Sequence, residues 1–375
     1  MKDTGSKGDL DLETVSPFSL MMQTAFTHSS NQQPGTQNDN VSLPQQLSLF
    51  FGGEISPHIG TFIQVSYDGQ GAAFGVDNID LRYANQAQLG SENLLYGVTI
   101  NNNPTVQDIW NSTPAWGFPY ASSSVAASPM ASTLIDGGLA QRVAGLGAYA
   151  LFNNLLYCEC SIYRSAQQGG AHPPDSTSVG IIKSLAPYWR LALQQQFNDQ
   201  YLELGTFGMS TAMYPAGTSG LTDTYNDFGF DLNYEKPFGD NLLTLHTSVI
   251  HESRNLDATF NANGSLRQSL NLNSLKIVGN YYLQQQIGFS LGYFSTSGDA
   301  DAALYAPAVL TGSSTGSPDS RGFISEFDVL PWMNTKFAVQ YVVYNKFNGS
   351  GGNYDGVGRN ASDNNSLYVL AWIVF

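Results

Sequence analysis

The feature that most restricts the fold of this chain is hydrophobic alternation with a period of two residues. The clearest case is the final segment "SLYVLAWIVF", Ser366–Phe375, in which every second residue from Leu367 to Phe375 is apolar. In an extended strand such residues share one face, because successive side chains point to opposite sides. The segment is too short for a transmembrane helix but has the length of one tilted transmembrane strand. It is therefore either a buried core strand or a strand that faces lipid.

The same alternation recurs in "DFGFDLNYE", "IGFSLGYFS" and "KFAVQYVVYN". One stripe of each segment is apolar or aromatic, and the other is polar or small, a separation that a helix would not produce. The apolar stripes are Phe228, Phe230, Leu232 and Tyr234; Ile287, Phe289, Leu291 and Tyr293; and Phe337, Val339, Tyr341 and Val343. We expect these stripes to face lipid.

Composition favours lipid over a buried core. Charged residues make up 12% of the chain, about half the share usual in soluble proteins. The mean hydropathy of -0.17 and the absence of a long apolar run exclude membrane helices. A transmembrane β-barrel satisfies both observations, because its strands alternate lipid-facing and lumen-facing residues.

Sixteen segments fit this pattern. They cover residues 18–28, 46–55, 59–68, 75–85, 93–101, 141–152, 155–165, 186–197, 200–212, 225–235, 241–252, 270–282, 286–296, 321–330, 335–345 and 366–375. An even number of strands closes an antiparallel barrel with both ends on one side. The sequence therefore predicts an all-β fold, a transmembrane antiparallel β-barrel of about 16 strands.

The connections between these segments alternate in length. Those near Asn153, Asn198 and Gly239 are short, whereas residues 102–140, 166–185, 253–269, 297–320 and 346–365 form long loops rich in Gly, Ser, Asn and Asp. Short periplasmic turns and long external loops are typical of outer-membrane barrels of Gram-negative bacteria, which we predict as the location. Residues 17–375 would form the barrel. Residues 1–16 would form an N-terminal tail, which carries no secretory signal peptide and so resembles a mature or truncated start.

The loop at 102–140 is far longer than most connections and is rich in aromatic residues. It carries Asp108, Trp110, Trp116 and Phe118, and disordered segments are poor in aromatics. One interpretation is that the loop folds into the lumen and narrows the passage. The other is that it covers the outside or contacts a neighbouring subunit.

Several ionisable residues lie on the polar stripes and should line the lumen, because charge facing lipid is costly. They are Asp80, Arg82, Glu159, Arg190, Asp227, Asp231, His246, Lys276 and Glu326. Their functional role would be to set ion preference or hold a plug. The alternative is that they simply hydrate and brace the interior.

The remaining chemistry is sparse. A net charge of -15 argues against a nucleic-acid partner, which needs clustered Lys and Arg. Cys158 and Cys160 share one strand face with poor disulfide geometry and without the further ligands of a metal site, so we expect free thiols. His246, Ser248 and Glu252 supply the residue types of a hydrolase, but their spacing along one strand does not favour a catalytic triad. We therefore expect no enzyme activity.

Several stretches resemble the barrel portion of monohaem cytochrome–porin fusion proteins of iron-oxidising bacteria. They include "LSLFFGGEISPHIGTFIQVSYDG", "VDNIDLRYAN" and "GAYALFNNLLYCECSIYRS", and the most specific runs from Asn101 to Tyr120. The resemblance implies a trans-outer-membrane conduit that sheathes a c-type cytochrome for extracellular electron transfer. Arg82 and Arg190 would then be the preferred contacts for haem propionates or other anions, because a guanidinium binds a carboxylate bidentately.

The chain departs from that family because it lacks the C-x-x-C-H motif that attaches haem c. Its five histidines are scattered singly and are better explained as polar wall or loop residues. Haem c is therefore implied only on a missing N-terminal segment or on a cytochrome partner. The alternative is a passive porin for small solutes or ions with a preference for cations.

Overall fold

A computed structural model describes residues 2–3, 10–11, 18–68, 73–166 and 173–375. Within them one antiparallel sheet of 17 strands forms a closed ring, in which β19 pairs with β3 and β9 pairs with β11. One of the 17, β10, is a two-residue strand that pairs with β12, which leaves 16 wall strands. The predicted class and strand number are therefore confirmed.

The wall strands follow one another around the ring in sequence order. They are β3 (Phe18–Ser29), β4 (Asn40–Ser56), β5 (Ile59–Asp68), β6 (Ala73–Leu89), β7 (Glu92–Asn101), β8 (Val143–Phe152), β9 (Leu156–Ser165), β11 (Ala186–Phe197), β12 (Gln200–Tyr214), β13 (Asp223–Phe238), β14 (Asn241–Asn255), β15 (Ser269–Leu283), β16 (Ile287–Gly298), β17 (Ser320–Trp332), β18 (Thr335–Lys346) and β19 (Ser366–Val374). The short elements are β10 (Ile181–Ile182), α1 (Asp257–Asn261) and single helical turns at Pro114–Trp116, Leu134–Gly138 and Ala361–Asn364. None of the helices in these ranges is long and apolar enough to cross a membrane.

Of the expected tail, residues 1–16, only Lys2–Asp3 (β1) and Leu10–Asp11 (β2) are described, and they pair antiparallel. The remaining tail residues lie outside the described ranges. The largest error in a predicted strand start concerns β4, which begins at Asn40 rather than at residue 46. Pro44 lacks an N–H and interrupts the pattern. The pairing continues past it through a register shift opposite Gln23 and Ala25.

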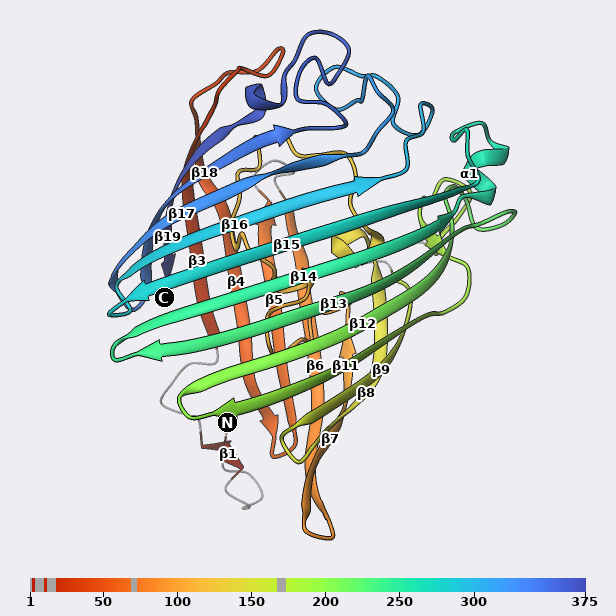
Figure 1. Cartoon of the computed structure of the whole chain (residues 1–375). Helices are drawn as coiled ribbons and strands as arrows, with labels where there is room; N and C mark the ends of the chain where they lie inside the picture. Colours follow the sequence, from red (N-terminus) through yellow and green to blue (C-terminus); the bar gives the residue numbers. More distant parts are fainter. Residues whose placement is uncertain (1, 4–9, 12–17, 69–72, 167–172) are drawn as a thin grey trace.

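Short turns and long loops occupy opposite ends of the barrel (Figure 1). The first wall strand begins and the last one ends on the short-turn side, where Leu20 and Phe375 exchange two backbone hydrogen bonds. Asn153 and Asn154 both have positive φ, the conformation that a type I′ hairpin turn requires and that Asn tolerates. The predicted asymmetry of the connections is therefore confirmed.

The two faces of the wall differ as the alternation predicted. Phe230 and Leu291 are 54% and 60% exposed on the outer face, whereas Asp231 and Gln340 are 4% and 1% exposed on the inner one. Each described wall strand pairs with a neighbour on both sides, so closure leaves none of these strands at a sheet edge. A closed ring with an apolar outer surface and a polar interior is the architecture that a bilayer requires.

The outer face also carries Cys158 and Cys160, which are free thiols. They alternate with the inward-facing Tyr157 and Glu159 along β9. Near the end of β19, the ring of Trp372 packs on the inner face beside Tyr368 and Leu370, below Lys336 Nζ at 5.9 Å from the ring centre.

Candidate functional site in the barrel lumen

The long connection between β7 and β8 is hydrogen-bonded to strands on different sides of the ring. Gln107 O accepts from Arg82 on β6 at 2.6 Å, and Ser112 Oγ donates to Asp231 on β13 at 2.5 Å. Farther along, Ala121 O accepts from Gln340 on β18 at 3.1 Å. A segment bonded to three separated strands lies across the lumen. We call residues 102–142 the inserted segment.

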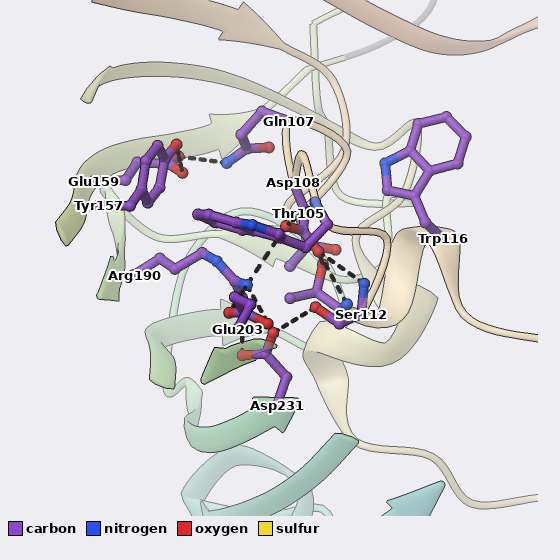
Figure 2. Close-up of polar contacts among 12 residues, drawn as sticks. Thr105, Gln107, Asp108, Ser112, Trp116, Tyr157, Glu159, Arg190, Glu203 and Asp231 are labelled. Carbon is purple, nitrogen blue, oxygen red and sulfur yellow. Dashed lines mark hydrogen bonds and ion pairs between the residues drawn. The ribbon is translucent and has the colours of Figure 1, made fainter. Parts of the chain in front are cut away.

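Arg190 on β11 lies at the centre of the contact between the inserted segment and the wall (Figure 2). Its guanidinium donates to both carboxylate oxygens of Asp231, at 3.0 and 2.7 Å, and to Glu203 Oε1 at 3.1 Å. Asp108 Oδ1 of the inserted segment lies 3.5 Å from Arg190 Nη2. The Arg190 side chain is fully buried. Charges removed from water in this way are tolerated only when they are paired and hydrogen-bonded.

Asp108 also determines the local fold of the inserted segment. Its carboxylate accepts hydrogen bonds from the backbone N–H groups of Trp110, Ser112 and Thr113, each at 3.1 Å, and from the Thr113 hydroxyl at 2.8 Å. A short acidic side chain that caps the following N–H groups stabilises a compact turn. Asn111 within this turn adopts a φ of 56°, which Asn tolerates better than most residues.

The Trp110 indole fixes the turn against the wall. Arg190 lies over its ring at 5.1 Å, and the indole Nε1–H donates to Gln194 Oε1 at 3.1 Å and to the Tyr201 hydroxyl at 2.5 Å. The ring also packs edge-on against Tyr157. Stacked guanidinium and aromatic groups attract each other most strongly where water is excluded.

Glu159 on β9 binds the residue next to Asp108. Its Oε1 accepts from the Gln107 amide at 2.6 Å and from Ser161 at 2.9 Å, and its Oε2 accepts from the Tyr157 hydroxyl at 2.9 Å. Farther along the inserted segment, Leu134 N–H donates to Glu252 at 2.6 Å and Ile135 N–H to Asp227 at 2.9 Å. Carboxylates of β9, β13 and β14 therefore hold the segment through its backbone and amide donors.

The opposite wall holds the inserted segment less closely. Lys276 on β15 pairs with Asp136 at 2.7 Å, and these side chains keep 34% and 18% of their surface exposed. Phe118 packs over Gly292 of β16, where an added Cβ would lie 3.3 Å from the ring. A cavity of about 360 Å³ separates residues 118–129 from strands β15 to β19. The lumen is thus filled on one side and open on the other.

The residues singled out from the sequence lie on the inner face, but in different settings. Asp80 pairs with Arg82, and Glu326 binds Lys336 and Gln340. Arg82 and Arg190 are already bound to protein carboxylates, and Arg190 is buried. This arrangement does not fit the role of anion contacts that we expected for the two arginines. Trp116 packs against Phe62 of β5, with its Nε1–H bonded to Val106 O.

Sequence reasoning missed several charged residues of the inner face. They are Glu203, Arg254, Asp328 and Lys336. Each lies on the polar stripe of its strand, so the period-two pattern could have identified all of them. What the pattern could not show is which of them bind the inserted segment.

His246 and Ser248 do not form a catalytic pair. Among the described residues, neither His246 Nδ1 nor Ser248 Oγ has a hydrogen-bond partner, although both atoms are buried. Glu252 is bound to Arg254 and to Leu134 N–H instead. The geometry therefore lacks the hydrogen-bonded relay that nucleophilic catalysis needs.

The residues present do not fit a lumenal haem c. Cys158 and Cys160 lie on the outer face of β9, and covalent attachment needs a C-x-x-C-H arrangement. The inserted segment crosses the lumen between β6, β13 and β18 and takes up part of the space that a haem domain would need.

The long loops are joined to one another at the barrel mouth. Asp301 accepts hydrogen bonds from Ser265 Oγ, Leu266 N and Arg267 N, each at 2.8 Å, and from Ala303 N and Leu304 N. Partial burial raises the pKa of Asp301, but these hydrogen bonds outweigh it and hold the pKa below its ordinary value. The carboxylate therefore contributes stability at neutral pH, which is lost as the pH falls below about 4.

No family model matches the sequence. No curated protein matches it either. Several solved structures are similar to the fold. The outer-membrane channel DcaP of Acinetobacter baumannii has a TM-score of 0.51 at 13% identity, covering 96% of both chains. OmpF of Salmonella typhi, in complex with daunomycin, has a TM-score of 0.50 at 11% identity, covering 96% of this chain and 97% of that one.

An anion-selective porin from Comamonas acidovorans is similar at a TM-score of 0.50 and 10% identity, covering 96% of this chain and 98% of that one. At such identities the likeness concerns the fold alone. That fold is the closed 16-strand antiparallel barrel of outer-membrane porins.

Proposed function

We propose that the protein is a passive diffusion channel of the porin type in the outer membrane of a Gram-negative bacterium, with a preference for small cationic solutes. The proposal rests on the lining and the width of the lumen. Most of its inner face is polar, an inserted segment anchored to one wall narrows it, and open space with a mostly apolar lining remains along the other wall. Porins control passage in this way, through the width and lining of the lumen rather than through chemistry.

The preference for cations rests on the charges of the lumen. Acidic side chains on the inner face and inserted segment are Asp80, Asp108, Asp136, Glu159, Glu203, Asp227, Asp231, Glu252, Glu326 and Asp328, and the basic ones that pair with them are Arg82, Arg190, Arg254, Lys276 and Lys336. A lumen with an acidic excess raises the local concentration of cations. The similar fold of an anion-selective porin indicates that the lining, not the barrel, sets the sign of selectivity.

Planar bilayers test this function directly. The purified protein should give stepwise ion conductance, and a KCl gradient should give a reversal potential of the sign expected for K⁺ over Cl⁻. Replacing the partly exposed Lys276 by glutamate should move the reversal potential farther toward K⁺. Protein-free bilayers are the control. A folded barrel without conductance would contradict the channel function, and a preference for Cl⁻ would contradict only its cation preference.

A cytochrome sheath for extracellular electron transfer is the second function to consider, because the sequence resembles the barrels of cytochrome–porin fusions. It would require residues 102–142 to leave the centre of the lumen, breaking the buried contacts of Asp108 and Trp110. The test is whether a haem c protein, recognised by its absorbance, co-purifies with the barrel from its native membrane. If no haem c protein co-purifies, the cytochrome sheath is contradicted and the passive porin remains the proposed function.

A further inference from the structure

The open side of the lumen is unlike the rest of the interior because its lining is mostly apolar. Between the inserted segment and the wall lies a chamber of about 360 Å³. Its apolar surface comes from Phe118, Val278, Phe294, Ile324, Val342 and Tyr368. A water-filled passage gains nothing from apolar walls, whereas an apolar part of a solute gains free energy by leaving water there.

The size of the chamber limits what it can hold. A dry cavity of roughly 150 Å³ accommodates a benzene ring. A chamber of about 360 Å³ therefore has room for one aromatic side group together with a small head. Aromatic rings also suit this lining, because Phe118 and Phe294 can contact a ring edge-on or offset.

Charged groups lie at one end of the chamber. A narrow space beside it shares five lining residues with it, namely Phe118, Asp136, Ser274, Lys276 and Val278. Among them, Lys276 and Asp136 form a pair that remains partly open to the lumen. An exposed ion pair contributes little stability, so a solute can replace one partner by its own charge at small cost.

Polar atoms without partners lie in the same narrow space on β14, where Ser248 is the cross-strand neighbour of Lys276. His246 Nδ1 and Ser248 Oγ line it, are buried, and have no hydrogen-bond partner among the described residues. Buried polar groups of folded proteins are normally satisfied. The narrow space has a volume of about 20 Å³, which is room for about one water molecule beside the ion pair.

From these observations we infer that the chamber binds a small aromatic solute with a zwitterionic head, such as an aromatic amino acid. The ring occupies the apolar chamber beside Phe118. The carboxylate of the head faces Lys276 and the ammonium faces Asp136, both of which line the chamber. Such a solute is too polar to cross a bilayer unaided, which is why a channel would serve it. This inference rests on the proposed channel function and adds a solute class without net charge to the small cations that the channel conducts.

Two variants of neighbouring residues on β18 test the chamber. Val342→Phe fills it from the inner face, whereas Val343→Phe adds the same ring on the outer face and is the matched control. Lys276→Gln removes the charge that faces the carboxylate. L-Phenylalanine is the probe, and L-serine is the control solute because it has the same head without the ring. Binding to the detergent-solubilised barrel is measured by equilibrium dialysis, and ion current is recorded separately in planar bilayers.

L-Phenylalanine should bind and reduce the ion current of the unmodified protein, and L-serine should do so at least about tenfold more weakly, since it buries no ring. Val342→Phe and Lys276→Gln should each weaken phenylalanine binding by about tenfold or more, with Val343→Phe unchanged. Equal binding of serine and phenylalanine, or equal effects of the two valine variants, would overturn the inference.

The binding and current measurements distinguish a failure of the proposed solute class from a failure of the channel function. Ion current without phenylalanine binding leaves the channel function intact and overturns the solute class. Phenylalanine binding without any ion current contradicts the channel function while retaining the site.

Discussion

The two sides of the lumen hold the same inserted segment in opposite ways. Toward β11 to β13, Arg190 and Asp108 are buried in a network of charged hydrogen bonds. Toward β15 to β19, the segment is held by the partly exposed Lys276–Asp136 pair and by hydrogen bonds from Gln340 and Tyr344, next to a cavity of about 360 Å³. This difference indicates that one wall positions the segment, whereas the other leaves room for a solute.

The largest effect is expected from Arg190→Ala. Removing the guanidinium leaves Asp108, Glu203 and Asp231 buried without their counter-charge, which should cost about 3–5 kcal/mol in the free energy of unfolding. Urea unfolding in lipid vesicles measures that cost. Arg321→Ala, on the exposed outer face of β17, is the control and should change stability by about 0.5 kcal/mol or less. Equal effects of the two variants would remove the distinction between the anchoring and the open wall.

Asp108→Asn should have the next largest effect. The amide keeps one acceptor oxygen, so its NH₂ group must face either the N–H of Trp110 or those of Ser112 and Thr113. An unsatisfied buried group of this kind costs about 1–3 kcal/mol. The turn should open, so a protease that leaves the unmodified barrel intact should cut within residues 102–142. Protection as in the unmodified barrel would show that Asp108 does not anchor the segment.

Two glycine variants compare the packing of the two walls. At Gly205 on β12, an added Cβ would lie under 3 Å from the carboxylate oxygens of Asp231 and Glu203, which are themselves fixed by Arg190. Gly205→Ala should therefore cost about 1–3 kcal/mol. Gly292→Ala would contact Phe118 at 3.3 Å, and this ring can move into the chamber. Its cost should stay below about 1 kcal/mol, and the reverse order in urea unfolding would contradict the comparison.

The smallest effect is expected from Asp136→Asn on the open wall. The Lys276–Asp136 pair is partly exposed, and exposed pairs contribute about 0–1 kcal/mol. Urea unfolding should detect little change, in contrast to Asp108→Asn in the same segment. A loss as large as that of Asp108→Asn would mean that the open wall anchors the segment as firmly as the other.

The sequence predicted the wall of the barrel well. Predicted β5 and β11 match the observed Ile59–Asp68 and Ala186–Phe197 in full, because each wall residue faces one of only two environments and the alternation records which. The predicted start of β4 failed at Pro44, where a local rule against proline in strands was overridden by a register shift. The same alternation held the signal for Glu203 and Lys336, although the prediction did not include them.

By itself, then, the sequence determined that the chain forms a closed ring of strands with a lipid-facing and a lumen-facing side. That information is local, since it depends only on the chemistry of residues two apart along a strand. Only the tertiary structure decided that Asp108 lies against Arg190 and that Phe118 stands beside open space. Those contacts join residues far apart in the chain, and no periodicity specifies which distant partner a buried charge or ring will find.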